Sequence, residues 1–174
     1  KNKLVPFGEF LPFENFLGKV GLRKITNGYQ SFSRDSNREI IKINNLKILP
    51  LICYEIIYSG KLSKNKDFDL LVNISEDGWF GKSIGPNQHF AHSIFRSIEE
   101  GKSSIRSTNN GISAFIDPLG RIINFKESTK SGAFIVNQVP SLNNKTFFSQ
   151  YGNNIFFNFF IIYIILIFFL KRIK

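Results

Sequence analysis

A single cysteine, Cys53, is the residue in this sequence best suited to covalent chemistry. It follows the apolar stretch Ile48-Leu49-Pro50-Leu51-Ile52 and precedes the polar pair Tyr54-Glu55. A buried strand that ends in this way delivers its last side chain to an exposed elbow. A thiolate nucleophile also needs a cation that lowers the thiol pKa, an oxyanion donor and a base. A lone cysteine is also a common small apolar core residue, so an inert Cys53 is the alternative.

Two histidines suggest other sites. His89 and His92 lie three residues apart on a predicted helix, a spacing that can place two ligands on a metal. No cysteine pair or acidic residue completes such a set, so we expect no metal and no other cofactor, with His89 capping the helix and His92 on the surface. A cysteine–histidine pair of the thiol-protease type, oriented by Asn109 or Asn110, is a further alternative.

Alternating strand and helix patterns must position these residues. Pro6, Gly8 and Pro12 indicate a shaped N-terminal loop rather than a helix. The expected helices are a short one near 13–22 and longer ones at 56–62 and 89–102. The expected strands are an edge strand at 39–43, strands at 46–52 and 67–74, and strands at 121–125 and 132–139, with turns at Asn44-Asn45 and at 117–120. One further strand is expected to begin at 103–105, to be interrupted by a polar stretch, and to resume at 112–116. Strands that alternate with helices indicate an α/β fold.

The C-terminal residues have a different character. Residues 155–170 are apolar except for Asn158 and Tyr163, and Lys171-Arg172 follow. As a helix these sixteen residues are about 24 Å long, which flanking residues can extend to the roughly 30 Å of a membrane core. We therefore expect a domain at 1–150 and a transmembrane helix with a basic cytoplasmic tail at 151–174. A buried core helix is the alternative.

Charge and composition limit the partners. The net charge is +10, but the lysines are scattered and no basic run with interleaved aromatics is present. This pattern argues against nucleic acid and favours a membrane surface. The chain has no Met and its first residues read like the middle of a domain, so we expect an upstream part.

Four blocks, in order, resemble a known family. They are KxxLVPFGE with a proline at 1–12, ICYEI at 52–56, WFGKSIGPNQHF at 79–90 and RSTNNG at 106–111, with RSIE at 96–99 as a weaker fifth. Together with the apolar C-terminal segment, they resemble apolipoprotein N-acyltransferases, membrane-bound members of the nitrilase (carbon–nitrogen hydrolase) superfamily. The implied fold is α/β, the C-terminal part of a nitrilase-like α-β-β-α sandwich followed by one transmembrane helix.

The resemblance implies a catalytic Glu-Lys-Cys triad. Cys53 matches the nucleophile and Lys1 the lysine, while the general-base Glu belongs upstream of Lys1 and is absent from this chain. Glu9 and Glu55 match two further acidic residues near the site.

The same resemblance implies an oxyanion hole and a substrate cleft. The backbone N–H of Tyr54 is the natural oxyanion donor beside the Lys1 ammonium, and Trp79 helps to line the cleft. Glu76 stands where the family commonly has Asn, and Gly78 where it often has Ala, which leaves fine substrate preference open.

The implied reaction moves an acyl group from a phospholipid to Cys53, and from the thioester to the N-terminal amine of a diacylglyceryl-cysteine apolipoprotein. The implied location is the bacterial inner membrane, with the catalytic domain periplasmic. We expect the 174-residue chain to be inactive alone. A nitrilase-like amidase and an inactive membrane-anchored interaction module are the alternatives.

Overall fold

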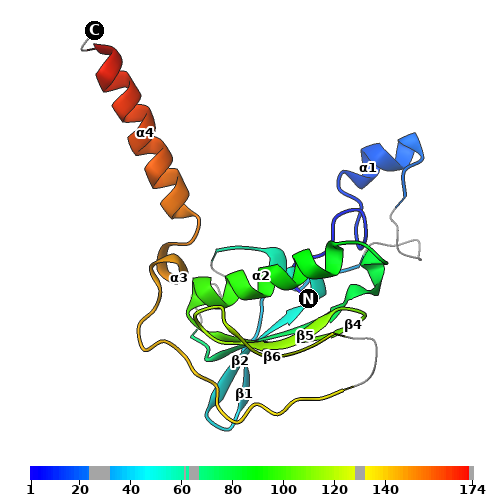
Figure 1. Ribbon diagram of the computed structural model, residues 1–174. Helices are drawn as coiled ribbons and strands as arrows, with labels where there is room; N and C mark the ends of the chain where they lie inside the picture. Colours follow the sequence, from blue (N-terminus) through cyan, green and yellow to red (C-terminus); the bar gives the residue numbers. More distant parts are fainter. Residues whose placement is uncertain (24–31, 61, 63–66, 128–131, 173–174) are drawn as a thin grey trace.

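The central element is a six-stranded mixed sheet in a computed structural model that describes residues 1–23, 32–60, 62, 67–127 and 132–172 (Figure 1). Its strands lie side by side in chain order: β1 (Ile41–Ile43), β2 (Leu46–Ile52), β3 (Leu70–Glu76), β4 (Ser103–Asn109), β5 (Ile112–Ile116) and β6 (Ile122–Glu127). β2, β3 and β4 are parallel, and the other three strands join antiparallel. The carboxyl ends of β2 and β3 therefore meet at one edge of the sheet.

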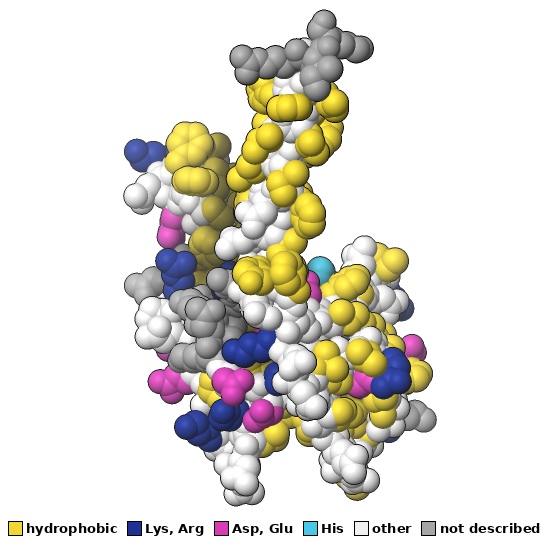
Figure 2. All heavy atoms as spheres, turned by 90° about the vertical axis from the view of Figure 1, so that its left-hand side faces the viewer, with side chains coloured by type: hydrophobic (Ala, Val, Ile, Leu, Met, Phe, Trp, Pro, Cys, Tyr) yellow, Lys and Arg dark blue, Asp and Glu magenta, His cyan; other side chains and the backbone are white. Residues whose placement is uncertain are grey.

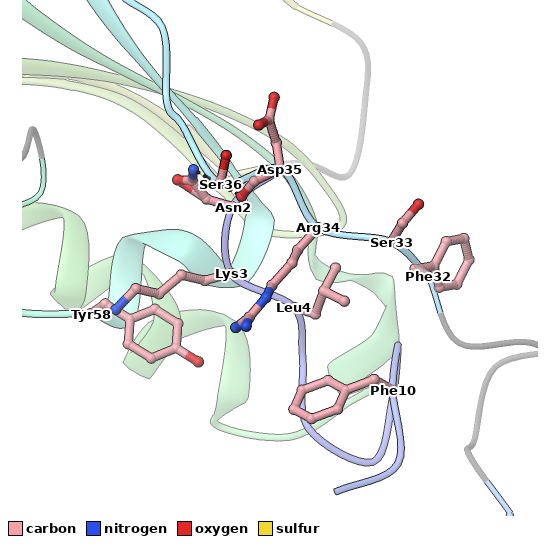
Figure 3. A pocket seen from close by; sticks show the side chains of 10 residues that line it. All are labelled: Asn2, Lys3, Leu4, Phe10, Phe32, Ser33, Arg34, Asp35, Ser36 and Tyr58. Carbon is pink, nitrogen blue, oxygen red and sulfur yellow. Dashed lines mark hydrogen bonds between the residues drawn. The ribbon is translucent and has the colours of Figure 1, made fainter. Parts of the chain in front are cut away.

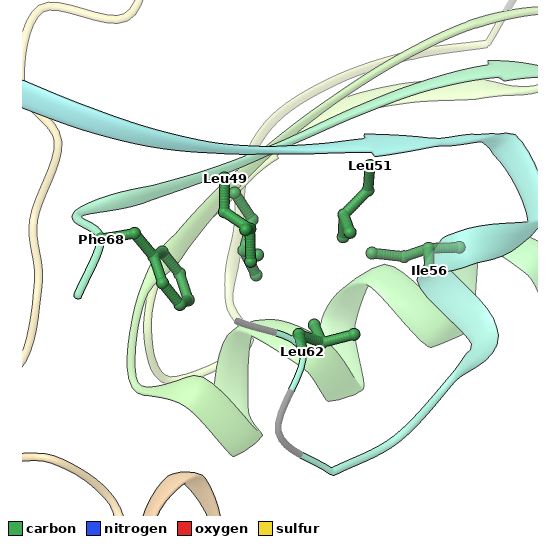
Figure 4. Packing of buried hydrophobic residues seen from close by; sticks show 6 residues of the cluster. Leu49, Leu51, Ile56, Leu62 and Phe68 are labelled. Atoms are coloured by element: carbon green, nitrogen blue, oxygen red, sulfur yellow. The ribbon is translucent and has the colours of Figure 1, made fainter. Parts of the chain in front are cut away.

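Helix α2 (Gly85–Glu100) covers one face of the sheet (Figure 1). Pro86 lies in its first turn, and Gly101 ends it in the left-handed conformation that glycine adopts at low cost. The main apolar core fills the space between β2 and this helix (Figure 4). It contains Leu49, Leu51, Ile56, Leu62, Phe68 and Leu71. A helix packed on a mixed sheet confirms the predicted α/β fold.

The opposite face of the sheet has no helix over it in the part of the chain that the structure describes (Figure 1). Ile52 and Ile74 are register partners on this face and are 46% and 63% exposed. The described chain thus forms one helix layer and one sheet layer.

Two segments project away from the sheet. The first contains α1 (Glu14–Leu17) and the 3₁₀ helix η1 (Gly18–Val20), and the second is α4 (Asn154–Arg172), which follows α3 (Phe147–Tyr151) (Figure 1). By length and composition α4 could cross a membrane, and none of the candidate span at 154–171 is buried. Figure 2 shows apolar side chains along this helix. The structure therefore supports the predicted membrane helix over a buried core helix, and the domain boundary at 150/151 stays a prediction.

Two expectations about strands are wrong: the interruption of one strand after residue 105 and the presence of a strand at 132–139. Residues 103–109 form one continuous strand, and 112–116 return beside it as β5 rather than resuming it. The chain reverses at Asn110, which has a φ of 49°. Residues 132–139 form no strand, and directly after them Ser103 Oγ donates to the carbonyl of Pro140 (2.5 Å), which joins the chain to the start of β4.

One further helix differs from the expectation, whereas both expected turns are present. The helix expected at 56–62 is a 3₁₀ helix, η2 (Cys53–Ile57), and residues 61 and 63–66 of that region lie outside the described residues. The turn at 44–45 is confirmed, with Asn44 at a φ of 51°. The turn at 117–120 is also confirmed, since the Gly120 amide donates to the Asp117 carbonyl at 3.0 Å.

Candidate active site

Cys53 lies where β2 ends and η2 begins, at the predicted elbow. Its φ is 50°, in the left-handed region that non-glycine residues seldom adopt. This conformation costs about 1–2 kcal/mol and must be held by contacts with its surroundings. The thiol is a free cysteine, and its residue is partly exposed. A strained turn at a strand end is typical of an enzymatic nucleophile, and that observation argues against an inert core cysteine.

Glu55 fastens the N-terminal segment to this elbow. Its buried carboxylate accepts hydrogen bonds from the backbone amides of Ile52 (2.8 Å), Asn2 (2.7 Å) and Lys3 (3.0 Å). Arg38 Nη2 adds an ion pair at 2.7 Å. Burial alone would raise the pKa of Glu55, but these amides and Arg38 outweigh it and lower the pKa. Glu55 is therefore ionised at neutral pH, and it ties residues 1–3 to the turn that contains Cys53.

Lys1 is held by Glu9. Lys1 Nζ lies 2.5 Å from Glu9 Oε1, and the pair is only partly exposed. The amide of Val5 donates to the other Glu9 oxygen at 2.9 Å, which fixes the carboxylate within its own loop. The structure thus pairs Lys1 with Glu9, and Glu55 joins their segment to the elbow. The described contact of the Lys1 ammonium runs to Glu9, so its role toward Cys53 stays a proposal.

The two predicted aromatic site residues are Tyr54, which lies in η2 between Cys53 and Glu55, and Trp79. The ring of Tyr54 packs edge-on against Tyr58, with 5.8 Å between the ring centroids. Trp79 lies on η3 (Asp77–Phe80), which follows β3, and is 68% exposed. η3 and the Cys53 turn follow neighbouring parallel strands, so Trp79 lies at the same sheet edge as the elbow.

A buried polar network reaches the elbow from the sheet. Asn73 Nδ2 donates to the carbonyls of Leu51 (3.1 Å) and Cys53 (3.2 Å), while its Oδ1 accepts from Arg106. Arg106 Nη2 contacts both carboxylate oxygens of Asp77, at 2.9 and 2.7 Å. Asn73, Asp77 and Arg106 are all almost completely buried. This network links the turn that contains Cys53 to the loop after β3.

His89 completes the network from α2. Its Nδ1 lies 2.9 Å from Asp77 Oδ1, and it is buried, so the expected helix cap is wrong. Burial would raise the pKa of Asp77, but hydrogen bonds from His89, Arg106 and Ser75 hold it at about 2. Because Asp77 is then ionised, the proton of this bond belongs to His89 Nδ1. The contacts of His89 with other described residues run to Asp77, Arg106 and the ring of Phe80 rather than to Cys53, so they give no support to a thiol-protease pairing.

His92 is half-buried rather than a surface residue. Burial lowers its pKa, and the charges of Arg96 and His89 act in the same direction. Asn73, Asp77 and Arg106 are not among the site residues that the sequence predicts. A polar Asn73 inside the apolar run Leu70-Leu71-Val72-Asn73-Ile74 is the signal that indicates such a buried role.

The two positions that depart from the family pattern are in contact. Glu76 caps η3 by accepting from the Gly78 amide at 2.8 Å, and its other oxygen accepts from Asn109. A Cβ atom at Gly78 would lie only 2.5 Å from Glu76 Oε1. The glycine therefore accommodates the Glu76 cap.

Known proteins match most of the chain. A family model described as carbon-nitrogen hydrolase matches residues 1–140. Apolipoprotein N-acyltransferases from Rickettsia prowazekii and Rhizobium rhizogenes are 43% and 39% identical, over 88% and 85% of this chain. The chain spans only 31% and 30% of the length of these relatives.

Solved structures give a weaker likeness. A CN-hydrolase superfamily protein from Xanthomonas campestris is 17% identical, with a TM-score of 0.47 over 67% of this chain and 46% of that one. The family model alone spans well over half of the sequence and includes the Cys53 elbow and the Lys1–Glu9 pair. The chain belongs to the carbon–nitrogen hydrolase family.

Proposed function

We propose that this protein is an apolipoprotein N-acyltransferase, which moves an acyl group from a phospholipid to the N-terminal amine of a diacylglyceryl-cysteine lipoprotein. The name of the relatives, at about 40% identity, supports this reaction. The structural observation that carries the proposal is the strained Cys53 turn, to which the buried Glu55 ties the segment that contains Lys1.

In the first step the Cys53 thiolate attacks an ester carbonyl of the phospholipid. A C–S bond forms, and the carbonyl oxygen becomes an oxyanion that the Tyr54 backbone N–H and the Lys1 ammonium stabilise. The ester C–O bond then breaks, and the lysophospholipid leaves as an alcohol after taking a proton. That proton passes through the general-base Glu expected upstream of Lys1.

In the second step the lipoprotein amine attacks the thioester carbonyl. A C–N bond forms, the amine gives up a proton to the same Glu, and the C–S bond breaks to restore the Cys53 thiolate. An amine acceptor rather than water separates this reaction from that of a nitrilase-like amidase. The apolar helix α4 favours the transferase, because both of its substrates are lipids.

The remaining site residues support the chemistry indirectly. Glu9 orients the Lys1 ammonium through their 2.5 Å contact, and Glu55 sets the distance between the N-terminal segment and the elbow. Trp79, exposed at the same sheet edge, lines the cleft through which lipid enters.

The protein acts at the bacterial inner membrane in this proposal. α4 crosses the bilayer, and Lys171 and Arg172 at its end favour a cytoplasmic C-terminus. The domain before it then lies on the periplasmic side, where it meets the diacylglyceryl-modified lipoprotein.

The test is mass spectrometry of the complete protein in detergent, incubated with phospholipid and no acceptor. We expect an acyl-sized mass increase on Cys53 that disappears when a diacylglyceryl lipopeptide is added. The Cys53→Ala variant should show no such increase. Release of free fatty acid from the adduct without any acceptor, and no N-acylated peptide when the lipopeptide is added, would favour the hydrolytic amidase. Absence of any adduct would favour the interaction module.

A further inference from the structure

An open cavity of about 930 Å³ lies beside the Lys1–Glu9 pair, and none of the chemistry above uses it (Figure 3). Its lining includes two cationic, two apolar and one aromatic hydroxyl side chain, which are Lys3, Arg34, Leu4, Phe10 and Tyr58. Its volume is within the range that holds a small ligand or one end of a larger one.

The cavity and the catalytic segment share the same stretch of backbone. Lys3 and Leu4 follow Lys1 closely, and Phe10 follows Glu9 directly. The Lys3 amide is bonded to Glu55, two residues after Cys53. The cavity therefore adjoins the backbone segment that contains Lys1 and Glu9 and that Glu55 ties to the Cys53 turn.

Two cationic side chains, those of Lys3 and Arg34, line this cavity. In Figure 3 the Lys3 side chain extends over the ring of Tyr58, while the Arg34 guanidinium ends to the right of that ring. Lys3 Nζ lies 4.1 Å from the centre of that ring, which steadies the ammonium without neutralising it. The carboxylate of Asp35 points away from both cations in Figure 3, and its Oδ1 accepts from the Asn37 amide at 3.0 Å.

The walls beside the cations are apolar. Leu4 and Phe10 lie below Arg34 in Figure 3, so cations and hydrocarbon meet in one cavity. Arginine and lysine bind phosphate oxygens strongly, arginine with a planar pair of donors. A phosphodiester joined to a hydrophobic chain matches both features. The diacylglyceryl-cysteine acceptor carries no phosphate, so this match distinguishes the two substrates.

We propose that Lys3 and Arg34 form a phosphodiester site that holds the headgroup of the acyl donor while its ester carbonyl reaches Cys53. This inference rests on the proposed acyl transfer and adds which substrate binds there, and through which groups. The site recognises the phosphate and leaves the rest of the headgroup unspecified.

The test measures single-turnover formation of the Cys53 thioester in the complete protein. The donors are a phosphatidylglycerol in mixed micelles and p-nitrophenyl palmitate, an acyl ester without phosphate. For the double variant Lys3→Gln, Arg34→Gln we expect the half-saturating phosphatidylglycerol concentration to rise at least tenfold, with little change for p-nitrophenyl palmitate. Lys19→Gln, which removes an exposed cation on η1, is the matched control and should change neither.

Equal losses with both donors would overturn the phosphate site, because they would indicate general damage to the elbow. No loss with phosphatidylglycerol would overturn it as well. If the wild-type protein forms no thioester with either donor, the proposed function fails instead.

A binding measurement separates the site from the reaction. A short-chain diether phosphatidylglycerol, which has no ester carbonyl to transfer, should slow alkylation of Cys53 by iodoacetamide, and the double variant should lose this protection. Inorganic phosphate at the same concentration should protect weakly. Equal protection by inorganic phosphate would contradict a lipid phosphodiester as the ligand.

Discussion

The side-chain amide of Asn73 donates a hydrogen bond to the backbone carbonyl of Cys53, 3.2 Å away. The two residues come from neighbouring parallel strands, and Asn73 lies in the buried face of β3. The same amide bonds the Leu51 carbonyl, so Asn73 holds both ends of the turn into which Cys53 is forced. The nucleophile's geometry thus depends on a polar group in the sheet as well as on its own turn.

Replacing Asn73 with Ala should loosen this elbow. The change leaves two carbonyls and Arg106 Nη1 without the Asn73 partner, which costs about 1–3 kcal/mol of unfolding free energy. We also expect the profile of Cys53 alkylation to change, because Asn73 no longer holds the backbone of the turn that positions the thiol. Thermal unfolding and iodoacetamide rates from pH 6 to 10 measure both effects. A variant that loses stability while keeping the wild-type alkylation profile would show that Asn73 is structural only.

Asp77 makes the network sensitive to acid. Its folded pKa of about 2 lies below the ordinary value of 3.8, so its contribution to stability is present above about pH 4 and is lost as the pH falls toward 2. The shift corresponds to roughly 2 kcal/mol. We expect Asp77→Asn to destabilise the protein by about that amount at pH 7 and by much less at pH 2.5. Denaturant unfolding at the two pH values tests this, and an equal loss at both would contradict it.

The sequence identified the elbow but not the network that supports it. The apolar run before Cys53 is local information, and its alternating Leu49 and Leu51 do pack in the core. The role of Arg106 depends on Asn73 and Asp77, which are 33 and 29 residues away. Local polarity instead suggested that the strand broke at Arg106, where in fact buried partners satisfy its charge.

The same limit explains α2 and residues 132–139. The amphipathic pattern of α2 predicts burial of Phe90, Phe95 and Ile98. Phe90 is buried, but Phe95 and Ile98 are exposed, while the charged residues Arg96 and Glu100 are buried. The short apolar run at 133–136 satisfies the composition criteria for a strand, but a strand also needs an edge to pair with. Ile135 is 82% exposed, so this run does not pack as a buried strand would.

Gly78 and Glu76 should be energetically coupled. A methyl group at Gly78 would displace Glu76 Oε1 from its cap on η3, so Gly78→Ala should cost about 1 kcal/mol. In Glu76→Asn the shorter side chain makes room for that methyl. The double variant should therefore lose less than the sum of the two single variants, by about 0.5–1.5 kcal/mol. Denaturant unfolding of the four proteins measures this coupling, and strict additivity would refute it.

Glu100, at the end of α2, should weaken the protein at alkaline pH. The side chain is 6% exposed, and its Oε1 has no hydrogen-bond partner among the described residues. Burial is the main cause that raises the pKa of Glu100 to about 6, and the nearby charge of Glu99 acts in the same direction. The Leu62 amide and the charge of Arg96 act in the opposite direction. Since the folded pKa exceeds the ordinary 4.5, the associated stability is complete below about pH 4.5 and is lost as the pH rises through 6.

Glu100→Gln imitates the protonated side chain at every pH. The shift from 4.5 to about 6 corresponds to roughly 2 kcal/mol, so we expect the variant to be more stable than the wild type by about 1–2 kcal/mol at pH 8 and equal to it near pH 4. Glu127→Gln, on the exposed strand β6, removes the same charge from the surface and serves as the control. Because net charge changes equally in both variants, a gain at pH 8 for Glu100→Gln alone assigns the effect to burial. Equal gains in the two variants would attribute it to overall charge instead.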